Sequence, residues 1–100
     1  MLPTTIFKVK ELREDINVLK SEFATDNLDS IVLTDNAILG ITATRHLCLS
    51  YDAPDVNEPL YINSTVIDEL TNTDSAYIGF EDGLNYEFYD SEDDIPTPCI

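Results

Sequence analysis

Two stretches with helical spacing, set among short strand-like runs, restrict the fold of this chain more than any other feature. In the first stretch, Leu12, Ile16, Leu19 and Phe23 fall on one face of a helix over residues 10–24. A helix with one apolar face is stable only when that face packs on another element. We therefore expect this helix to lie against a sheet.

The second helical stretch covers residues 64–71, with Ser64 expected at its N-cap. Val66, Ile67 and Leu70 form its inward face. Strands are expected where short apolar runs are bounded by turn residues. These runs are residues 6–9, 30–34, 37–42, 47–51, 60–62, 76–80 and 84–89.

The expected order of elements is β-α-β-β-β-β-α-β-β, with most consecutive strands joined as hairpins. This order is typical of an α+β domain in which an antiparallel sheet carries two short amphipathic helices on one face. One hundred residues correspond to one domain. We expect that domain over residues 1–90, followed by an acidic, proline-containing tail over residues 91–100.

Charge limits the partners that the chain can have. It has 20 acidic and 5 basic residues, a formal net charge of -15. Residues 1–51 hold all five basic and seven acidic residues, whereas residues 52–100 hold thirteen acidic and no basic residues. Nucleic acid and anionic membranes would repel such a body. The charge favours a cationic partner, either a basic protein surface or a bound metal.

The sequence shows no pattern of a catalytic, cofactor or metal site. Its one histidine, His46, lies at an expected turn, where a surface role is commoner than general-base catalysis. Residues 90–94 are rich in acids but lack the central glycine and distal glutamate of a calcium loop. The three glycines are scattered, so no phosphate-binding loop is expected. We expect a non-enzymatic protein without cofactor or metal.

The cysteines and the N-terminus bear on location. Cys48 lies in an apolar run and is expected to be a small buried hydrophobic residue, while Cys99 lies too near the end for a prenylation motif. A disulfide between the two stays open. The first residues have no basic region and no long apolar run, so neither a signal peptide nor a membrane span is expected. The expected location is the cytoplasm, that of the host cell if the protein is encoded by a phage.

Four segments of the chain follow one another as in a known fold. They are the strand at 6–9 that leads into a helix, the run ITATRHL at 41–47, the run LYINSTVIDEL at 60–70 and the hairpin EDGL at 81–84. Their order resembles one domain of the bacterial DNA polymerase sliding clamp, the β subunit, over roughly residues 5–89. The resemblance implies a DNA-clamp-like α+β fold and a processivity factor that acts as a homo-oligomer around DNA.

The chain departs from the clamp pattern in ways that oppose DNA binding. A clamp chain carries two or three such domains, and this chain carries one. Asp68 and Glu69 stand where a clamp helix usually offers basic residues, and they would repel DNA. On the first helix, Lys10, Arg13 and Lys20 share one edge of the polar face, which in a clamp would face DNA. We interpret them as solvated surface residues, because three cations on so acidic a body give little DNA affinity.

Two functions of different classes remain. The first is an inhibitor, since the composition resembles that of phage-encoded acidic DNA mimics of the anti-CRISPR or anti-restriction type. Such a protein would occupy the basic nucleic-acid-binding surface of a host protein. The second is a clamp-like processivity factor assembled through edge strands, with a clamp look-alike that engages clamp partners without DNA as a third, weaker possibility.

For the inhibitor, the expected partner-binding residues are the acids of the second half together with one tyrosine. Tyr89, beside an acid, is the aromatic expected to make an exposed contact with Arg or Lys. The acids are Asp52, Asp55, Glu58, Asp68, Glu69, Asp74, Glu81, Asp82, Glu87, Asp90, Glu92, Asp93 and Asp94.

Overall fold

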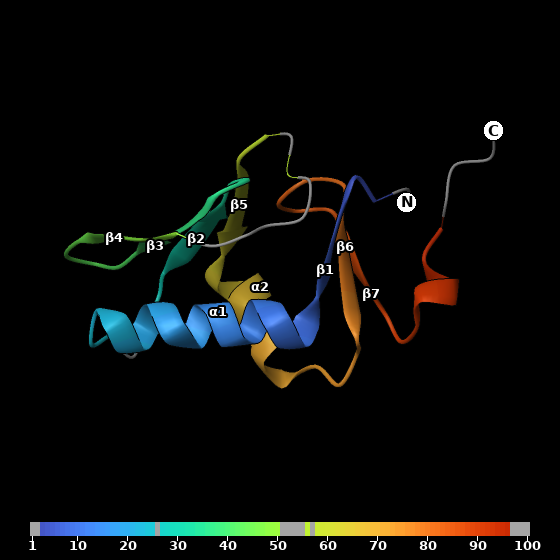
Figure 1. Ribbon diagram of the computed structural model, residues 1–100, viewed down its shortest axis with the longest axis horizontal. Helices are drawn as coiled ribbons and strands as arrows, with labels where there is room; N and C mark the ends of the chain where they lie inside the picture. The colour runs from blue at the N-terminus through green and yellow to red at the C-terminus, as the bar shows by residue number, and fades with distance from the viewer. Residues whose placement is uncertain (1–2, 26, 51–55, 57, 97–100) are drawn as a thin grey trace.

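The computed structural model describes residues 3–25, 27–50, 56 and 58–96 of the chain. It confirms the expected α+β class and the expected order of helices and strands (Figure 1). The observed bounds differ from the expected ones by at most two residues. The elements are β1 (Thr5–Lys8), α1 (Val9–Glu22), β2 (Ser30–Leu33), β3 (Ala37–Ile41), β4 (His46–Ser50), β5 (Leu60–Asn63), α2 (Ser64–Asn72), β6 (Tyr77–Phe80), β7 (Tyr86–Tyr89) and the 3-10 helix η1 (Glu92–Asp94).

The strands divide between two antiparallel sheets, so the prediction of a single antiparallel sheet is wrong within the confirmed α+β class. One sheet has the order β4-β3-β2-β5 and the other the order β1-β6-β7. The chain therefore consists of two similar halves, β1-α1-β2-β3-β4 and β5-α2-β6-β7. The first strand of each half pairs with the second strand of the other half, β1 with β6 and β5 with β2. Neither sheet is complete without both halves, which makes the two halves one domain.

Both helices bury their apolar faces against the sheets (Figure 1). On α1, Leu12, Ile16 and Leu19 are buried as expected, while Phe23 is only partly buried. Gly40 allows α1 to approach β3 closely, because a Cβ there would lie 2.8 Å from the Leu19 side chain. The helix thereby covers the inner face of the four-stranded sheet.

The cap of α2 lies one residue earlier than expected. The side-chain oxygen of Asn63 accepts a hydrogen bond from the backbone N–H of Val66 at 3.1 Å, whereas Ser64 is already helical. Asparagine is as good an N-cap as serine, and its extended backbone places its oxygen over the first turn. The prediction of Ser64 as the cap is therefore wrong by one position.

Cys48 is exposed, so the prediction that it is buried is wrong. Side chains alternate along a strand, and on β4 the inner positions are taken by Leu47 and Leu49. Cys48 is thus on the outer face, opposite Leu39 of β3. Cys99 lies outside the described residues, and so does any disulfide that it forms.

In the described part of the chain, no helix is long and apolar enough to cross a membrane.

Candidate functional site

The acids expected to bind a partner are exposed wherever the structure describes them. They come from the segment before β5, from α2, from the α2–β6 connection, from the β6–β7 hairpin, from β7 and from the tail. Asp52 and Asp55 lie outside the described residues. The exposed acids are Glu58, Asp68, Glu69, Asp74, Glu81, Asp82, Glu87, Asp90, Glu92, Asp93 and Asp94.

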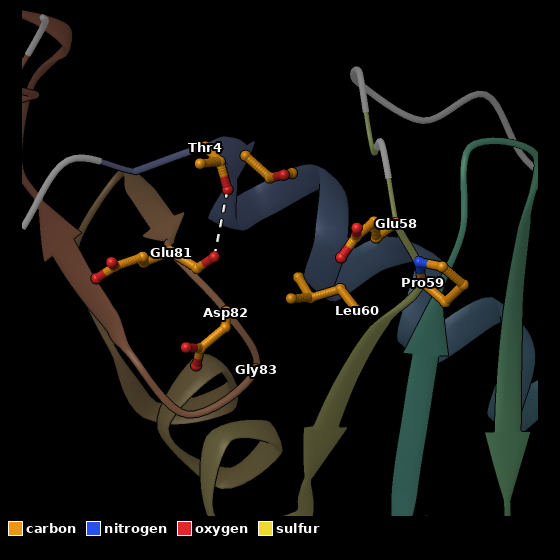
Figure 2. Close-up of a pocket in the computed structure, with 8 residues that line it drawn as sticks. Thr4, Glu58, Pro59, Leu60, Glu81, Asp82 and Gly83 are labelled. Atoms are coloured by element: carbon orange, nitrogen blue, oxygen red, sulfur yellow. Dashed lines mark hydrogen bonds between the residues drawn. The ribbon is translucent and has the colours of Figure 1, made fainter.

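Three of these acids meet at a cleft between the two sheets. The cleft has a volume of about 300 Å³ and is lined by Glu58, Glu81 and Asp82, among others. Figure 2 shows the Glu58 carboxylate turned into the gap and the carboxylates of Glu81 and Asp82 turned away from it. The backbone carbonyl of Glu81 accepts a hydrogen bond from the Thr4 hydroxyl at 3.3 Å. The cleft therefore presents a single free carboxylate and does not form a cage for a cation.

Asp82 has a structural role in the hairpin turn. Its carboxylate accepts hydrogen bonds from the side-chain amide of Asn85 at 2.8 Å and from the N–H groups of Leu84 and Asn85 at 2.8 and 2.9 Å. These bonds, that of the Asn85 side chain foremost, lower the pKa of Asp82 below its ordinary value of 3.8. The turn is thus stabilised by this carboxylate at neutral pH and loses that support as the pH falls through the lowered pKa.

Glu69 connects α2 to β7. The Tyr86 hydroxyl donates a hydrogen bond to the Glu69 carboxylate, and the Tyr86 ring packs between Phe80 and Phe88. Burial of the ring, followed by the hydrogen bond and negative charge of Glu69, raises the pKa of Tyr86 to about 12. The Glu69 carboxylate is therefore exposed but already accepts one hydrogen bond within the protein.

Tyr89 is buried, with 7% of its surface exposed, so the prediction of an exposed contact is wrong. The physical reason is Gly79 on the neighbouring strand β6. A Cβ at Gly79 would lie 3.0 Å from the Tyr89 ring and 2.8 Å from Pro3, so the absent side chain leaves room for both. The Tyr89 hydroxyl donates a weak 3.4 Å hydrogen bond to the Glu87 carboxylate. Tyr89 covers the outer face of the three-stranded sheet and is not available to a partner.

Two acids near the end of the chain bind local hydroxyls. The Asp90 carboxylate accepts a hydrogen bond from Ser75 at 3.3 Å, and the Asp94 carboxylate accepts one from Ser91 at 3.1 Å. Glu92 to Asp94 form η1, with all three side chains exposed. This part of the expected tail is therefore folded, and it carries its acids on the surface.

Both arginines are directed at the C-terminal ends of the helices. Arg13 donates three hydrogen bonds to α2, two to the carbonyl of Leu70 at 3.2 and 2.9 Å and one to that of Thr73 at 2.8 Å. Arg45 donates to the carbonyl of Phe23 at the end of α1, and its guanidinium lies 6.0 Å from the Phe23 ring centre. A cation at a helix C-terminus satisfies free carbonyls and complements the helix dipole.

The lysines complete the set proposed to face DNA in a clamp. Lys10 is exposed and Lys20 is partly buried near the other end of α1. Lys8 and Lys10 line an open groove of about 540 Å³ together with Arg13 and Asp74. Because Arg13 is hydrogen-bonded to the end of α2, Lys10 is the lysine of the predicted basic stripe that lines this groove, which Asp74 also lines, and Lys20 is not among the lining residues.

Three acidic residues, Glu11, Glu14 and Asp15, lie close together on the first turns of α1. We expect Asp15→Asn to stabilise the fold at neutral pH. Burial, with repulsion from Glu11 and Glu14, raises the pKa of Asp15 above its ordinary value of 3.8. A carboxyl group whose pKa is raised in the folded protein stabilises the fold at pH values below its unfolded-state pKa. This contribution is lost as the pH rises through its folded-state pKa. Thermal unfolding should give the variant a higher Tm at about pH 7 and no advantage at about pH 3, where Asp15 is protonated.

The matched control for this prediction is Glu58→Gln, which removes the same charge from an exposed site. An equal rise in Tm in both variants would show that net charge, and not the setting of Asp15, is responsible.

Among the residues that the structure describes, no group of three or more His, Cys, Asp or Glu side chains is placed to hold a metal ion. Compared with known protein families, curated proteins and solved structures, the chain matches none. Its own charge and geometry therefore carry the functional proposal.

Proposed function

We propose that this chain is a non-enzymatic acidic domain that binds a basic, nucleic-acid-binding protein in place of nucleic acid. In this role it acts as a DNA mimic of the kind that phages and mobile elements use against CRISPR or restriction systems, inside the host cytoplasm. The observation that carries the proposal is the second half of the chain, where thirteen acids occur without a single Lys or Arg.

The arrangement of charges supports this proposal. All acids of the second half that are described lie at the surface, so their negative charge reaches a partner through solvent. All five Lys and Arg residues belong to the first half of the chain, so no cation of the second half offsets these acids. A body of this kind steers toward a basic groove and binds it in a salt-dependent manner.

Capture with a charge-reversed variant tests the proposal. The purified chain is immobilised and exposed to a bacterial extract at low and high salt, with excess duplex DNA as competitor. We expect a basic nucleic-acid-binding protein that is released by salt and by DNA. Reversing Glu58, Asp68 and Asp93 to lysine should weaken its capture by about tenfold or more.

The control reverses Glu11, Glu14 and Glu22 of α1 to lysine, three exposed acids of the first half. Both variants change the net charge by the same amount, so a difference between them reports the position of the charge. The proposal fails if duplex DNA does not compete, or if the two variants lose capture equally.

The alternative function is a sliding-clamp-like processivity factor that acts as a homo-oligomer. It is favoured by the open edges of the sheets, because β4 and β7 each pair on one side only in the described residues. An open edge of one copy offers hydrogen bonds to an edge of the next, and a rotation that closes gives a ring. A closed ring in sedimentation at micromolar concentration would support this function, and a monomer would exclude it.

A further inference from the structure

The four-stranded sheet has an outer face without any charged side chain. The register places Val32 of β2 between Leu39 of β3 and Tyr61 of β5, all on the side away from α1. Leu39 is in turn opposite Cys48, and Ile41 is opposite His46. The complete outer set is Ser30, Val32, Ala37, Leu39, Ile41, His46, Cys48, Ser50, Tyr61 and Asn63.

Several of these side chains are open to solvent. Tyr61 is 54% exposed, Cys48 and His46 are exposed, and Val32, Leu39 and Ile41 are partly exposed. The face is also hollowed between β3 and β4 by a depression of about 290 Å³ lined by Leu39, Ile41, His46 and Cys48, among others. A hollow of this size admits a single apolar side chain. The residues that contribute most to protein binding usually insert into pockets of this kind.

The β6–β7 hairpin meets the β5 edge of this sheet and carries a further exposed apolar residue. Gly83, at the tip of the β6–β7 hairpin, lies against the backbone carbonyl of Tyr61. The next residue, Leu84, is 73% exposed, so the two most exposed large apolar residues of the described chain lie at the same edge. Exposed apolar residues therefore lie on the outer face, from the hollow at β4 to Tyr61 of β5, and also on the hairpin that meets β5.

We propose that this outer face is the docking surface for a basic protein partner, which inserts an apolar side chain framed by Lys and Arg. Protein interfaces combine a core depleted of charge with a polar rim, and here the exposed acids Asp29, Asp35 and Glu58 flank strands of the uncharged face, with Arg45 in the β3–β4 turn. A partner with cations around an apolar centre complements both parts. A second copy of this chain is a poorer occupant, because its own charge repels the first. The inference rests on the proposed function and adds to it the site at which the partner inserts an apolar side chain.

Two synthetic peptides of equal charge test the inference, one alternating Lys with Leu and the other Lys with Ser, each of about twelve residues. We expect the Lys/Leu peptide to bind about tenfold more tightly, with amide shifts in NMR spectra concentrated on β3 and β4. Cys48→Glu places a charge in the hollow and should abolish this preference. Val18→Glu is the matched control, because Val18 is a 46% exposed apolar residue on α1 and the added charge is the same.

Each outcome separates the docking surface from the proposed DNA mimicry. Equal binding of both peptides, or loss of the preference in Val18→Glu as well, overturns the docking surface and leaves the proposed DNA mimicry standing. Binding of neither peptide at low salt contradicts both proposals. Self-association that strengthens with salt and is prevented by Cys48→Glu would assign the face to a second copy and overturn the inference.

Discussion

Replacing Gly83 with alanine is expected to lower the free energy of unfolding by about 3 kcal/mol, the upper part of the range for overpacking. A Cβ at this position would overlap the carbonyl oxygen of Tyr61. Because that oxygen belongs to the backbone of β5, no side-chain rotation relieves the clash. The hairpin must move away from β5, which separates the two sheets where they meet.

Urea unfolding followed by circular dichroism measures this loss, with Leu84→Ala as the control. Leu84 is the next residue of the same turn and is 73% exposed, so its truncation should change stability by no more than about 0.5 kcal/mol. If Gly83→Ala unfolds at the same urea concentration as the parent chain, the hairpin does not pack on β5 and the description of this junction is wrong.

Replacing Arg13 with methionine is expected to cost about 2 kcal/mol of stability. The variant retains the aliphatic bulk but loses three charge-assisted hydrogen bonds to the carbonyls of Leu70 and Thr73 at the end of α2. Leu70 is fully buried, and its carbonyl depends on this guanidinium. The end of α2 should therefore loosen, and amide hydrogen exchange in its last turn should quicken before global unfolding.

Lys10→Met is the matched control, since it removes the same charge from an exposed position of the same helix. Its effect should stay within about 0.5 kcal/mol. Arg13→Lys should recover only part of the loss, because an ammonium group cannot donate to both carbonyls in the fixed geometry of a guanidinium. If Arg13→Met and Lys10→Met are equally stable, Arg13 is a solvated surface residue, as the sequence alone indicates.

The acidic surface and the uncharged sheet face make different contributions to the proposed binding. Exposed carboxylates of the second half set the rate and salt dependence of encounter. The outer face of the four-stranded sheet supplies the desolvated contact that holds the partner after encounter. Charge reversal at Glu58, Asp68 and Asp93 should therefore act mainly on association, and Cys48→Glu mainly on dissociation.

The helices, the strands, their order and the charge asymmetry are all predicted from the amino-acid sequence. These features depend on local spacing and composition, such as Leu12, Ile16 and Leu19 on one helical face. The alternation of side chains along β3 and β4 predicts which of their residues share the uncharged outer face. Only the assembly of these strands with β2 and β5 into one sheet makes that face a single surface.

Which distant segments meet depends on tertiary packing. The pairing of β1 with β6 and of β2 with β5 produced two sheets, because strands pair with partners that the local sequence does not specify. Tyr89 is buried because Gly79 on another strand leaves room for its ring. Arg13 of α1 donates hydrogen bonds to the end of α2 because the two helices lie close together in the fold. Such contacts depend on the packing of the whole chain, so a reading of local patterns assigns these side chains to solvent.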